Sequence, residues 1–216
     1  MNERIKGLMK QVDYPAPEIA LREKMNYLRS EIEHRGIYRC NVHNLPAKSP
    51  GKAYSWQFYL RRCLYNPQFA FTAAELLVDK LSSRDVQIGA CEDAGVTLGM
   101  AMATILRVPM MTIKKSRKSY GLLNFTEGPI TGLPILLVDD LAGSQTTLRQ
   151  ARYTLTSFKL PITTQYATLI NKTEGTHPTY LEDMELINLF TCKDFTLEWR
   201  SYLIKYGKEP NFGRHF

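Results

Sequence analysis

The chain has 216 residues, of which 44% are apolar, and a formal net charge of +7 at pH 7. This length and composition fit one globular domain, with or without a small appendage, and exclude a disordered chain. No apolar stretch reaches the length of a membrane span and the N-terminus lacks a signal-peptide pattern, so we expect a soluble, cytoplasmic protein. The positive charge suits anionic ligands. A nucleic-acid role stays open but is not favoured, because the basic residues do not alternate with aromatic ones along one face.

The N-terminal third predicts two helices and two strands. Apolar residues at helical spacing indicate a helix over Glu18 to His34, and Asn66-Pro67 starts a second one that ends near Ser83. Between them we expect a short strand at Ile37 to Val42 and an aromatic strand at Tyr54 to Leu60. The four cysteines share no metal-ligand spacing, which indicates reduced thiols, buried or partly buried, at Cys40, Cys63, Cys91 and Cys192.

Strands and helices alternate through the rest of the chain, which indicates βαβ units and a mainly parallel sheet. The expected strands are Val86 to Ala90, Pro109 to Lys114, Ile135 to Asp139, Thr163 to Ile170 and Leu186 to Phe190. The expected helices are Gly95 to Leu106, Thr147 to Phe158, a turn at Pro178 to Asp183 and a last helix at Lys193 to Tyr206.

The segment from Pro134 to Leu148 carries the clearest functional pattern. A buried strand runs into two carboxylates, Asp139 and Asp140, at the edge where open α/β sheets bind ligands. A small, hydroxyl-rich turn then opens a helix, whose free N-H groups and dipole favour an anion; the turn consists of Gly143, Ser144, Gln145, Thr146 and Thr147. The segment predicts a phosphate site backed by acids for ribose hydroxyls or hydrated Mg²⁺. A buried strand that ends in an N-capped turn without a ligand is the alternative.

A basic cluster without apolar periodicity lies between Lys114 and Thr126. It holds Lys114, Lys115, Arg117 and Lys118 within five residues. Such a segment is typical of a loop that orders over a polyanion. A solvated basic hairpin is the alternative.

Four segments, in this order, resemble those of type I phosphoribosyltransferases, and of orotate phosphoribosyltransferases in particular. They are Gly51-Lys52 leading to Phe58 to Arg61, Gly89 to Gly95, Lys114 to Gly121, and Val138-Asp139-Asp140; Asn171 to Gly175 is a weaker fifth. The resemblance implies an α/β fold with a central, mainly parallel sheet flanked by helices and a small, hood-like N-terminal part. Residues 1–45 would form an N-terminal helix and extension and residues 46–216 the phosphoribosyltransferase-like domain, the two together as one compact unit.

The resemblance also implies a reaction. Phosphoribosyl would pass from phosphoribosyl pyrophosphate to a nucleobase, orotate or a related pyrimidine. Pyrophosphate would be released, and Mg²⁺ would be the cofactor. The ion would be held mainly through substrate and water, with Asp139 or Asp140 as its protein ligand. A homodimer with a shared active site is implied as well. Transfer to another acceptor, and a non-catalytic sensor of phosphoribosyl pyrophosphate or nucleotide that binds RNA or protein, stay open as alternatives.

The resemblance assigns roles to particular residues. Asp139 and Asp140 would stabilise the ribose as its C1 bond loosens, and Lys118 would neutralise the leaving pyrophosphate. The turn Gly143 to Thr147 would hold the 5′-phosphate. Lys52, Lys114, Lys115, Tyr120 and Lys172 would be further substrate contacts. The pyrophosphate loop would consist of Ala90, Cys91, Glu92, Asp93, Ala94 and Gly95.

The chain departs from the family pattern at several of these positions. The family has Thr or Ser where this chain has Gly143, Gly where it has Gln145, and Arg where it has Lys172. Gln145 would be strained if its position needs a positive φ. The planar guanidinium of arginine can bind a carboxylate through two hydrogen bonds, whereas the ammonium of Lys172 is a single point charge. This replacement weakens recognition of a carboxylate. Ala94 stands where some members have a Lys that contacts pyrophosphate, and Tyr120 stands where many have a His.

Overall fold

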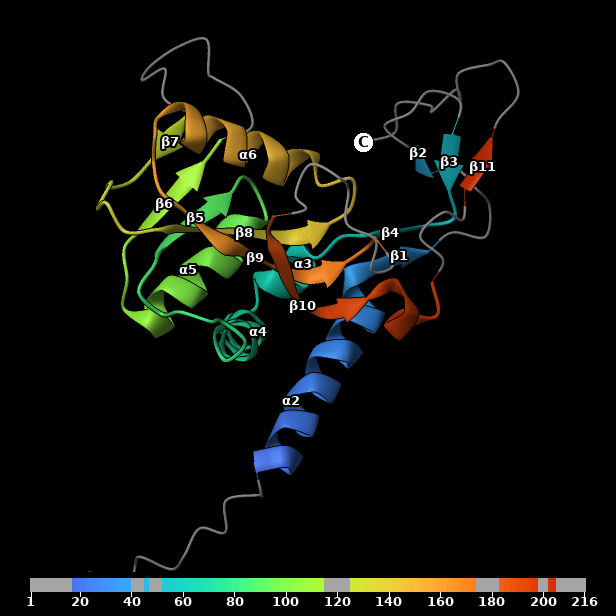
Figure 1. The fold of residues 1–216 in the computed structure, drawn as a ribbon. Coiled ribbons are helices and arrows are strands. Elements are labelled where there is room, and N and C mark those ends of the chain that lie inside the picture. The colour runs from blue at the N-terminus through green and yellow to red at the C-terminus, as the bar shows by residue number, and fades with distance from the viewer. Residues whose placement is uncertain are drawn as a thin grey trace, which may run out of the picture.

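A six-stranded sheet runs through the centre of the molecule in the order β10-β9-β8-β5-β6-β7 (Figure 1). This computed structural model describes residues 17–39, 45–46, 52–114, 125–173, 183–197 and 202–204. The strands of the sheet are β5 (Gln87–Cys91), β6 (Met110–Ile113), β7 (Thr126–Glu127), β8 (Ile135–Ala142), β9 (Ile162–Asn171) and β10 (Glu185–Thr191). All neighbouring pairs are parallel except β6 and β7. The predicted α/β architecture is therefore confirmed.

Helices cover both faces of the sheet. On one face lie α4 (Pro67–Val78) and α5 (Gly95–Leu106), which bury Phe69, Leu77 and Met102. The other face is covered by α6 (Thr146–Ser157), which buries Leu148 and Leu155 (Figure 1). Burial on both faces explains why β5 and β8 read as continuous apolar runs rather than alternating ones.

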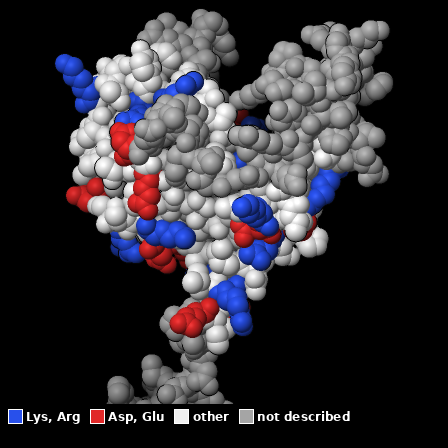
Figure 2. Space-filling view, turned by 45° about the vertical axis from the view of Figure 1, so that its right-hand side comes forward, with Lys and Arg blue, Asp and Glu red and all other residues white. Residues whose placement is uncertain are grey.

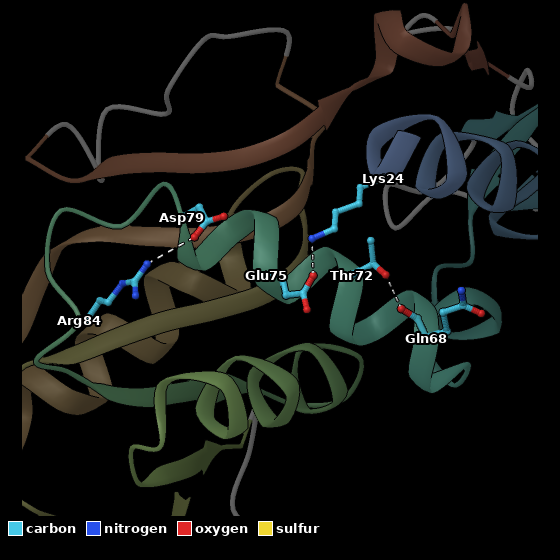
Figure 3. Close-up of polar contacts among 6 residues, drawn as sticks. All are labelled: Lys24, Gln68, Thr72, Glu75, Asp79 and Arg84. Carbon is cyan, nitrogen blue, oxygen red and sulfur yellow. Dashed lines mark hydrogen bonds and ion pairs between the residues drawn. The ribbon is translucent and has the colours of Figure 1, made fainter. Parts of the chain in front are cut away.

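The N-terminal helix α2 (Pro17–Glu31) packs on α4. Its Leu28 is fully buried in the main core, and the ring of Tyr27 lies 6.4 Å from that of Phe69. Figure 3 shows Lys24 reaching from α2 to Glu75 on α4, with Nζ 2.8 Å from Oε2. The first described residues therefore share a core with the sheet.

Two further groups of strands lie beside the carboxyl ends of the central sheet. The short strands β1 (Ile37–Arg39) and β4 (Trp56–Phe58) pair antiparallel. A separate three-stranded sheet has the order β11-β3-β2, from Tyr202–Ile204, Lys52–Tyr54 and Leu45–Pro46 (Figure 1). These strands correspond to the hood-like part that the resemblance implies, although one of them comes from the C-terminal end of the chain.

Two expected elements are wrong. The helix expected at Lys193 to Tyr206 is a single 3₁₀ turn, η3 (Cys192–Phe195), followed by strand β11. A capping box between Thr191 and Asp194 starts this turn, and Thr196 ends it in the left-handed conformation, with φ of 53°. The single strand expected at Tyr54 to Leu60 is divided at Ser55, because β3 pairs with β2 and β11 while β4 pairs with β1.

Other boundaries differ by a few residues. The α-helix expected to reach His34 ends at Glu31 and continues as a π-helical turn, η1 (Ile32–Gly36). Helix α4 ends at Val78 rather than near Ser83. Helix α3 (Arg61–Leu64) and strand β7 were not expected. The turn expected at Pro178 to Asp183 lies almost wholly outside the described residues, as do the last three residues of the strand expected at Ile37 to Val42.

Candidate functional site

The two acids of the sequence motif lie inside β8, which continues to Ala142 instead of ending at Asp139 as expected. Pairing with β5 stops at Val138, whereas pairing with β9 continues through Asp139 opposite Thr168. The carboxylates therefore lie where one flank of the strand is already free of its neighbour. Asp139 is only 7% exposed, and its Oδ1 accepts the backbone N-H of Asp140 at 2.9 Å. This hydrogen bond fixes the carboxylate of Asp139 against the backbone of Asp140.

The start of α5 lies directly against Asp139. A Cβ atom on Gly95 would stand 2.8 Å from the carbonyl oxygen of Val138 and 3.0 Å from Cα of Asp139. Backbone atoms cannot yield as a flexible side chain can, so glycine is required at this point. Gly95 therefore brings the N-terminus of α5 against the acid pair.

The turn between β8 and α6 has the form expected of an anion cradle, with one unusual residue. The hydroxyl groups of Ser144 and Thr146 are exposed and lie 3.0 Å apart. Gln145, between them, is 3% exposed and left-handed, with φ of 54°. Neither oxygen nor nitrogen of its amide has a hydrogen-bond partner among the described residues. The strain expected for a side chain at this position is thus present, together with a buried, unpaired amide.

The predicted pyrophosphate loop connects β5 to α5. Ala90 and Cys91 are buried in the last two positions of β5, and residues 92–94 form the turn, with a cis peptide between Glu92 and Asp93. The backbone N-H of Glu92 donates to Ile113 at 2.9 Å. Half of the Asp93 side chain is exposed, and Oδ2 lies 2.9 Å from Nη2 of Arg61 on α3. The loop therefore brings two carboxylates to the sheet edge that also carries Asp139.

The predicted basic contacts divide into three groups. Lys115, Lys118 and Tyr120 lie outside the described residues. Lys114 is 5% exposed and forms an ion pair with Glu127 on β7, so its charge is already balanced within the fold. Lys52 lies in β3, in the small sheet rather than in the central one.

Lys172 lies at the same edge of the central sheet as the acids. Its backbone N-H donates to the carbonyl of Ala142 at 2.7 Å, and its Nζ lies 5.1 Å from the ring centroid of Trp56 on β4. Burial lowers the pKa of Lys172 to about 8, and the nearby Cys192 thiol opposes this shift. The lysine is therefore held between the turn that ends β9 and the hood-like part.

Two residues near the site were not assigned a role from the sequence. Arg61 belongs to a segment that carries the resemblance, but its partner Asp93 is 32 residues further along the chain. Trp56 is two positions from Phe58 on a strand of alternating burial, a pattern that indicates a core residue and gives no hint of Lys172. Cys63, Cys91 and Cys192 form no disulfide and are buried, as expected, and burial raises the pKa of Cys63 to about 11. Cys40 lies outside the described residues.

The described residues hold neither a protein metal cage nor a membrane span. No group of three His, Cys, Asp or Glu side chains among them could hold a metal ion. No described helix is long and apolar enough to cross a membrane.

Comparison with known proteins finds two sequence relatives, both orotate phosphoribosyltransferases. The Methanocaldococcus jannaschii enzyme is 23% identical over 67% of this chain and 82% of its own length. The Caenorhabditis elegans enzyme is 27% identical over 70% of this chain and 73% of its own length. No family model matches the chain.

Solved structures agree on the fold. The orotate phosphoribosyltransferase of Mycobacterium tuberculosis superposes with a TM-score of 0.65 at 15% identity, over 81% of this chain and 99% of that one. The same enzyme in complex with 5-phospho-α-D-ribosyl 1-diphosphate gives a TM-score of 0.60 at 14% identity, over 80% and 92% of the two chains. Together with the acid pair and the turns around it, these likenesses show a fold of the type I phosphoribosyltransferase class. Within that class the chain resembles orotate phosphoribosyltransferase, as a divergent relative.

Proposed function

We propose that this protein is an enzyme that transfers phosphoribosyl from phosphoribosyl pyrophosphate to a pyrimidine base, orotate or a close relative, and releases pyrophosphate. Three features meet at one edge of the sheet, and this observation carries the proposal. They are the acid pair of β8, the start of α6 with its hydroxyl groups, and the start of α5, where Gly95 packs closely against Asp139. Helix N-termini favour anionic groups, and carboxylates favour ribose hydroxyls and developing positive charge. The two relatives carry this enzyme name, which supports the same assignment for this chain.

Phosphoribosyl transfer depends on charged groups of the protein placed around the substrate, and it needs no nucleophile from the protein. A ring nitrogen of the base loses its proton to solvent and forms a bond to C1, while the bond from C1 to the pyrophosphate oxygen breaks and its electron pair leaves with pyrophosphate. Asp139 and Asp140 would hold the ribose and stabilise the positive charge that develops at C1. Lys118 would neutralise the leaving group, with Lys115 and Tyr120 as further contacts.

Mg²⁺ belongs to this proposal as an ion that arrives with the substrate. The described acids form no cage of three, and Asp139 already accepts the N-H of Asp140. This donor set fits a hydrated ion held by one carboxylate and by substrate phosphates, which is a common arrangement for Mg²⁺. When bound, the ion would offset the charge of the pyrophosphate.

A homodimer is also part of the proposal. Tyr65, Phe71 and Met100 are exposed, at 70%, 41% and 53%, and line an open groove of about 450 Å³ between α4 and α5. An exposed apolar patch of this kind favours a protein contact. Because α5 begins at the pyrophosphate loop, a second copy bound at this groove would lie close to the site. Light scattering on the wild type and on Met100→Glu tests this surface.

The test of the function is release of pyrophosphate from phosphoribosyl pyrophosphate and Mg²⁺ with a panel of bases. We expect release with orotate, and loss of turnover without loss of folding when Asp139 and Asp140 are both changed to Asn. Tight binding of the sugar phosphate without release for any base would reject the enzyme.

One observation favours a second candidate, a non-catalytic sensor of phosphoribosyl pyrophosphate or nucleotide. Glu92 and Asp93 put negative charge in the loop that would approach pyrophosphate, and Gln145 puts a bulky side chain in the phosphate turn. On the face drawn in Figure 2, basic and acidic side chains are interspersed over the described surface, which does not favour an RNA partner. Binding without turnover would support the sensor.

A further inference from the structure

The contact between Lys172 and Trp56 joins the central sheet to the hood-like part. Nζ lies 5.1 Å from the centroid of the indole, within the range in which the negative face of an aromatic ring attracts a cation. Lysine has a long, flexible stem whose ammonium otherwise takes many positions. The contact therefore restricts where this charge lies.

The backbone of Lys172 is fixed at the edge of the sheet. Its N-H donates to Ala142, which immediately precedes the phosphate turn, at 2.7 Å. The next residue, Thr173, donates its N-H and its hydroxyl to Oδ1 of Asn171 at 2.8 and 2.6 Å. These bonds fix the backbone of the turn after β9, from which the side chain of Lys172 extends.

Trp56 is held from the other side by a row of aromatic rings. Its ring lies 5.4 Å from that of Phe58 at 73°, and Phe58 lies 5.7 Å from Phe195. Phe195 in turn lies 5.5 Å from Phe190 on β10. Only 5% of Trp56 is exposed, so it offers a ligand little stacking surface of its own. An effect of Trp56 on a ligand would therefore have to pass through Lys172.

We propose that Trp56 is a positioning residue for the acceptor base, which holds the Lys172 ammonium as one fixed positive charge beside the phosphate turn. The base selected by this arrangement is a planar ring with a single anionic substituent, in preference to its neutral analogue. A point charge attracts such a group without the paired bonds that an arginine fork would form. The inference rests on the proposed function, because it concerns the acceptor of the same reaction.

Steady-state kinetics with orotate and with uracil, its analogue without the carboxylate, test the inference. With phosphoribosyl pyrophosphate and Mg²⁺ saturating, Trp56→Leu should raise KM for orotate roughly tenfold, since a desolvated cation and indole attract by an amount of that order, and leave kcat within about twofold. Trp56→Phe, which keeps an aromatic face, should recover most of the loss. KM for uracil should not change.

Phe69→Leu is the matched control, because Phe69 is fully buried in the same core but lies on α4, where its ring packs against Tyr27 rather than Trp56. It should lower the melting temperature about as much as Trp56→Leu while KM for orotate stays at the wild-type value. Equal KM values for the two leucine variants would overturn the inference and leave the proposed function intact.

Fluorescence gives a readout that does not need turnover. The sequence has two tryptophans, so Trp199→Phe leaves Trp56 as the only indole. Orotate should change its emission, uracil should not, and Lys172→Met in the same background should abolish the response. An orotate response without turnover of any base would sustain the inference and reject the proposed enzyme. An emission that orotate leaves unchanged, in a protein that turns orotate over, would overturn the inference alone.

Discussion

Nη2 of Arg61 lies 2.9 Å from Oδ2 of Asp93, so helix α3 is joined to the turn between β5 and α5. Both side chains are partly exposed, at 39% and 53%, and such pairs contribute little to stability, about 0–1 kcal/mol. We expect the pair to affect ligand binding rather than stability. Arg61 balances a carboxylate in the loop that the proposed function brings to pyrophosphate.

We predict that Arg61→Ala raises KM for phosphoribosyl pyrophosphate several-fold, because it leaves the charge of Asp93 unbalanced near an anion. The double change with Asp93→Ala should restore most of the loss. Arg84→Ala is the matched control, since Arg84 pairs with Asp79 at 3.4 Å on the far end of α4 (Figure 3). It should leave KM unchanged. A double variant as impaired as Arg61→Ala alone would show that the guanidinium acts in another way.

Gln145 combines two local costs. Its left-handed backbone costs about 1 kcal/mol or more for a residue other than glycine, and its buried, unpaired amide costs about 1–3 kcal/mol. We predict that Gln145→Gly raises the free energy of unfolding by about 1–2 kcal/mol, after part of the gain is lost to the greater freedom of glycine in the unfolded chain. Urea denaturation measures this change.

Lys159→Gly is the control for the backbone term alone. Lys159 has φ of 57°, is exposed and lies at the other end of α6. Its replacement should stabilise the protein by less than Gln145→Gly does. If Gln145→Gly instead destabilises the protein, as a cavity-forming substitution does, the amide is hydrogen-bonded in solution and its burial carries no cost.

The sequence was sufficient for the five parallel strands of the central sheet, because apolar runs and turn residues are local signals. The start of α5 at Gly95 and the turn before α6 were predicted for the same reason, although β8 continues past Asp139 to Ala142. Contacts between distant segments had no local signal, which is why the partners of Arg61 and Lys172 were missed. The prediction of a C-terminal helix was wrong because Tyr202–Ile204 pairs with β3, a tertiary contact that overrides helical propensity.

Lys172 should make recognition of an anionic base depend on pH. Burial lowers its pKa to about 8, so the ammonium is present below that pH and is lost above it. We predict that KM for orotate rises as pH increases through about 8. In Lys172→Arg, whose guanidinium stays charged, KM should be flat to about pH 9.5. A wild-type KM that is equally flat would remove Lys172 from the acceptor site.

The same shift sets the sign of the pH effect on stability. The pKa of Lys172 is lower in the folded chain than the usual 10.5, so the unfolded chain binds more protons between about pH 8 and 10.5. The wild type should therefore gain stability relative to Lys172→Met as pH rises through this window, by at most about 3 kcal/mol. Cation attraction to Trp56 reduces this gain. Paired denaturation curves at about pH 7 and 10 measure it.

Gly95 provides the test of how closely the acid pair depends on α5. A Cβ at this position would stand 2.8 Å from the carbonyl oxygen of Val138, a distance that real Cβ contacts essentially never show, and 3.0 Å from Cα of Asp139. We predict that Gly95→Ala pushes the start of α5 away from β8, lowers the free energy of unfolding by about 1–3 kcal/mol, and reduces kcat more than KM.

Gly36→Ala is the control, because its Cβ would meet only side-chain atoms, at 3.1 Å or more, far from the acids in sequence. It should cost some stability and leave kcat near the wild-type value. If both variants lose stability equally and keep kcat, the contact of Gly95 with Asp139 is one of packing and does not position the acid pair.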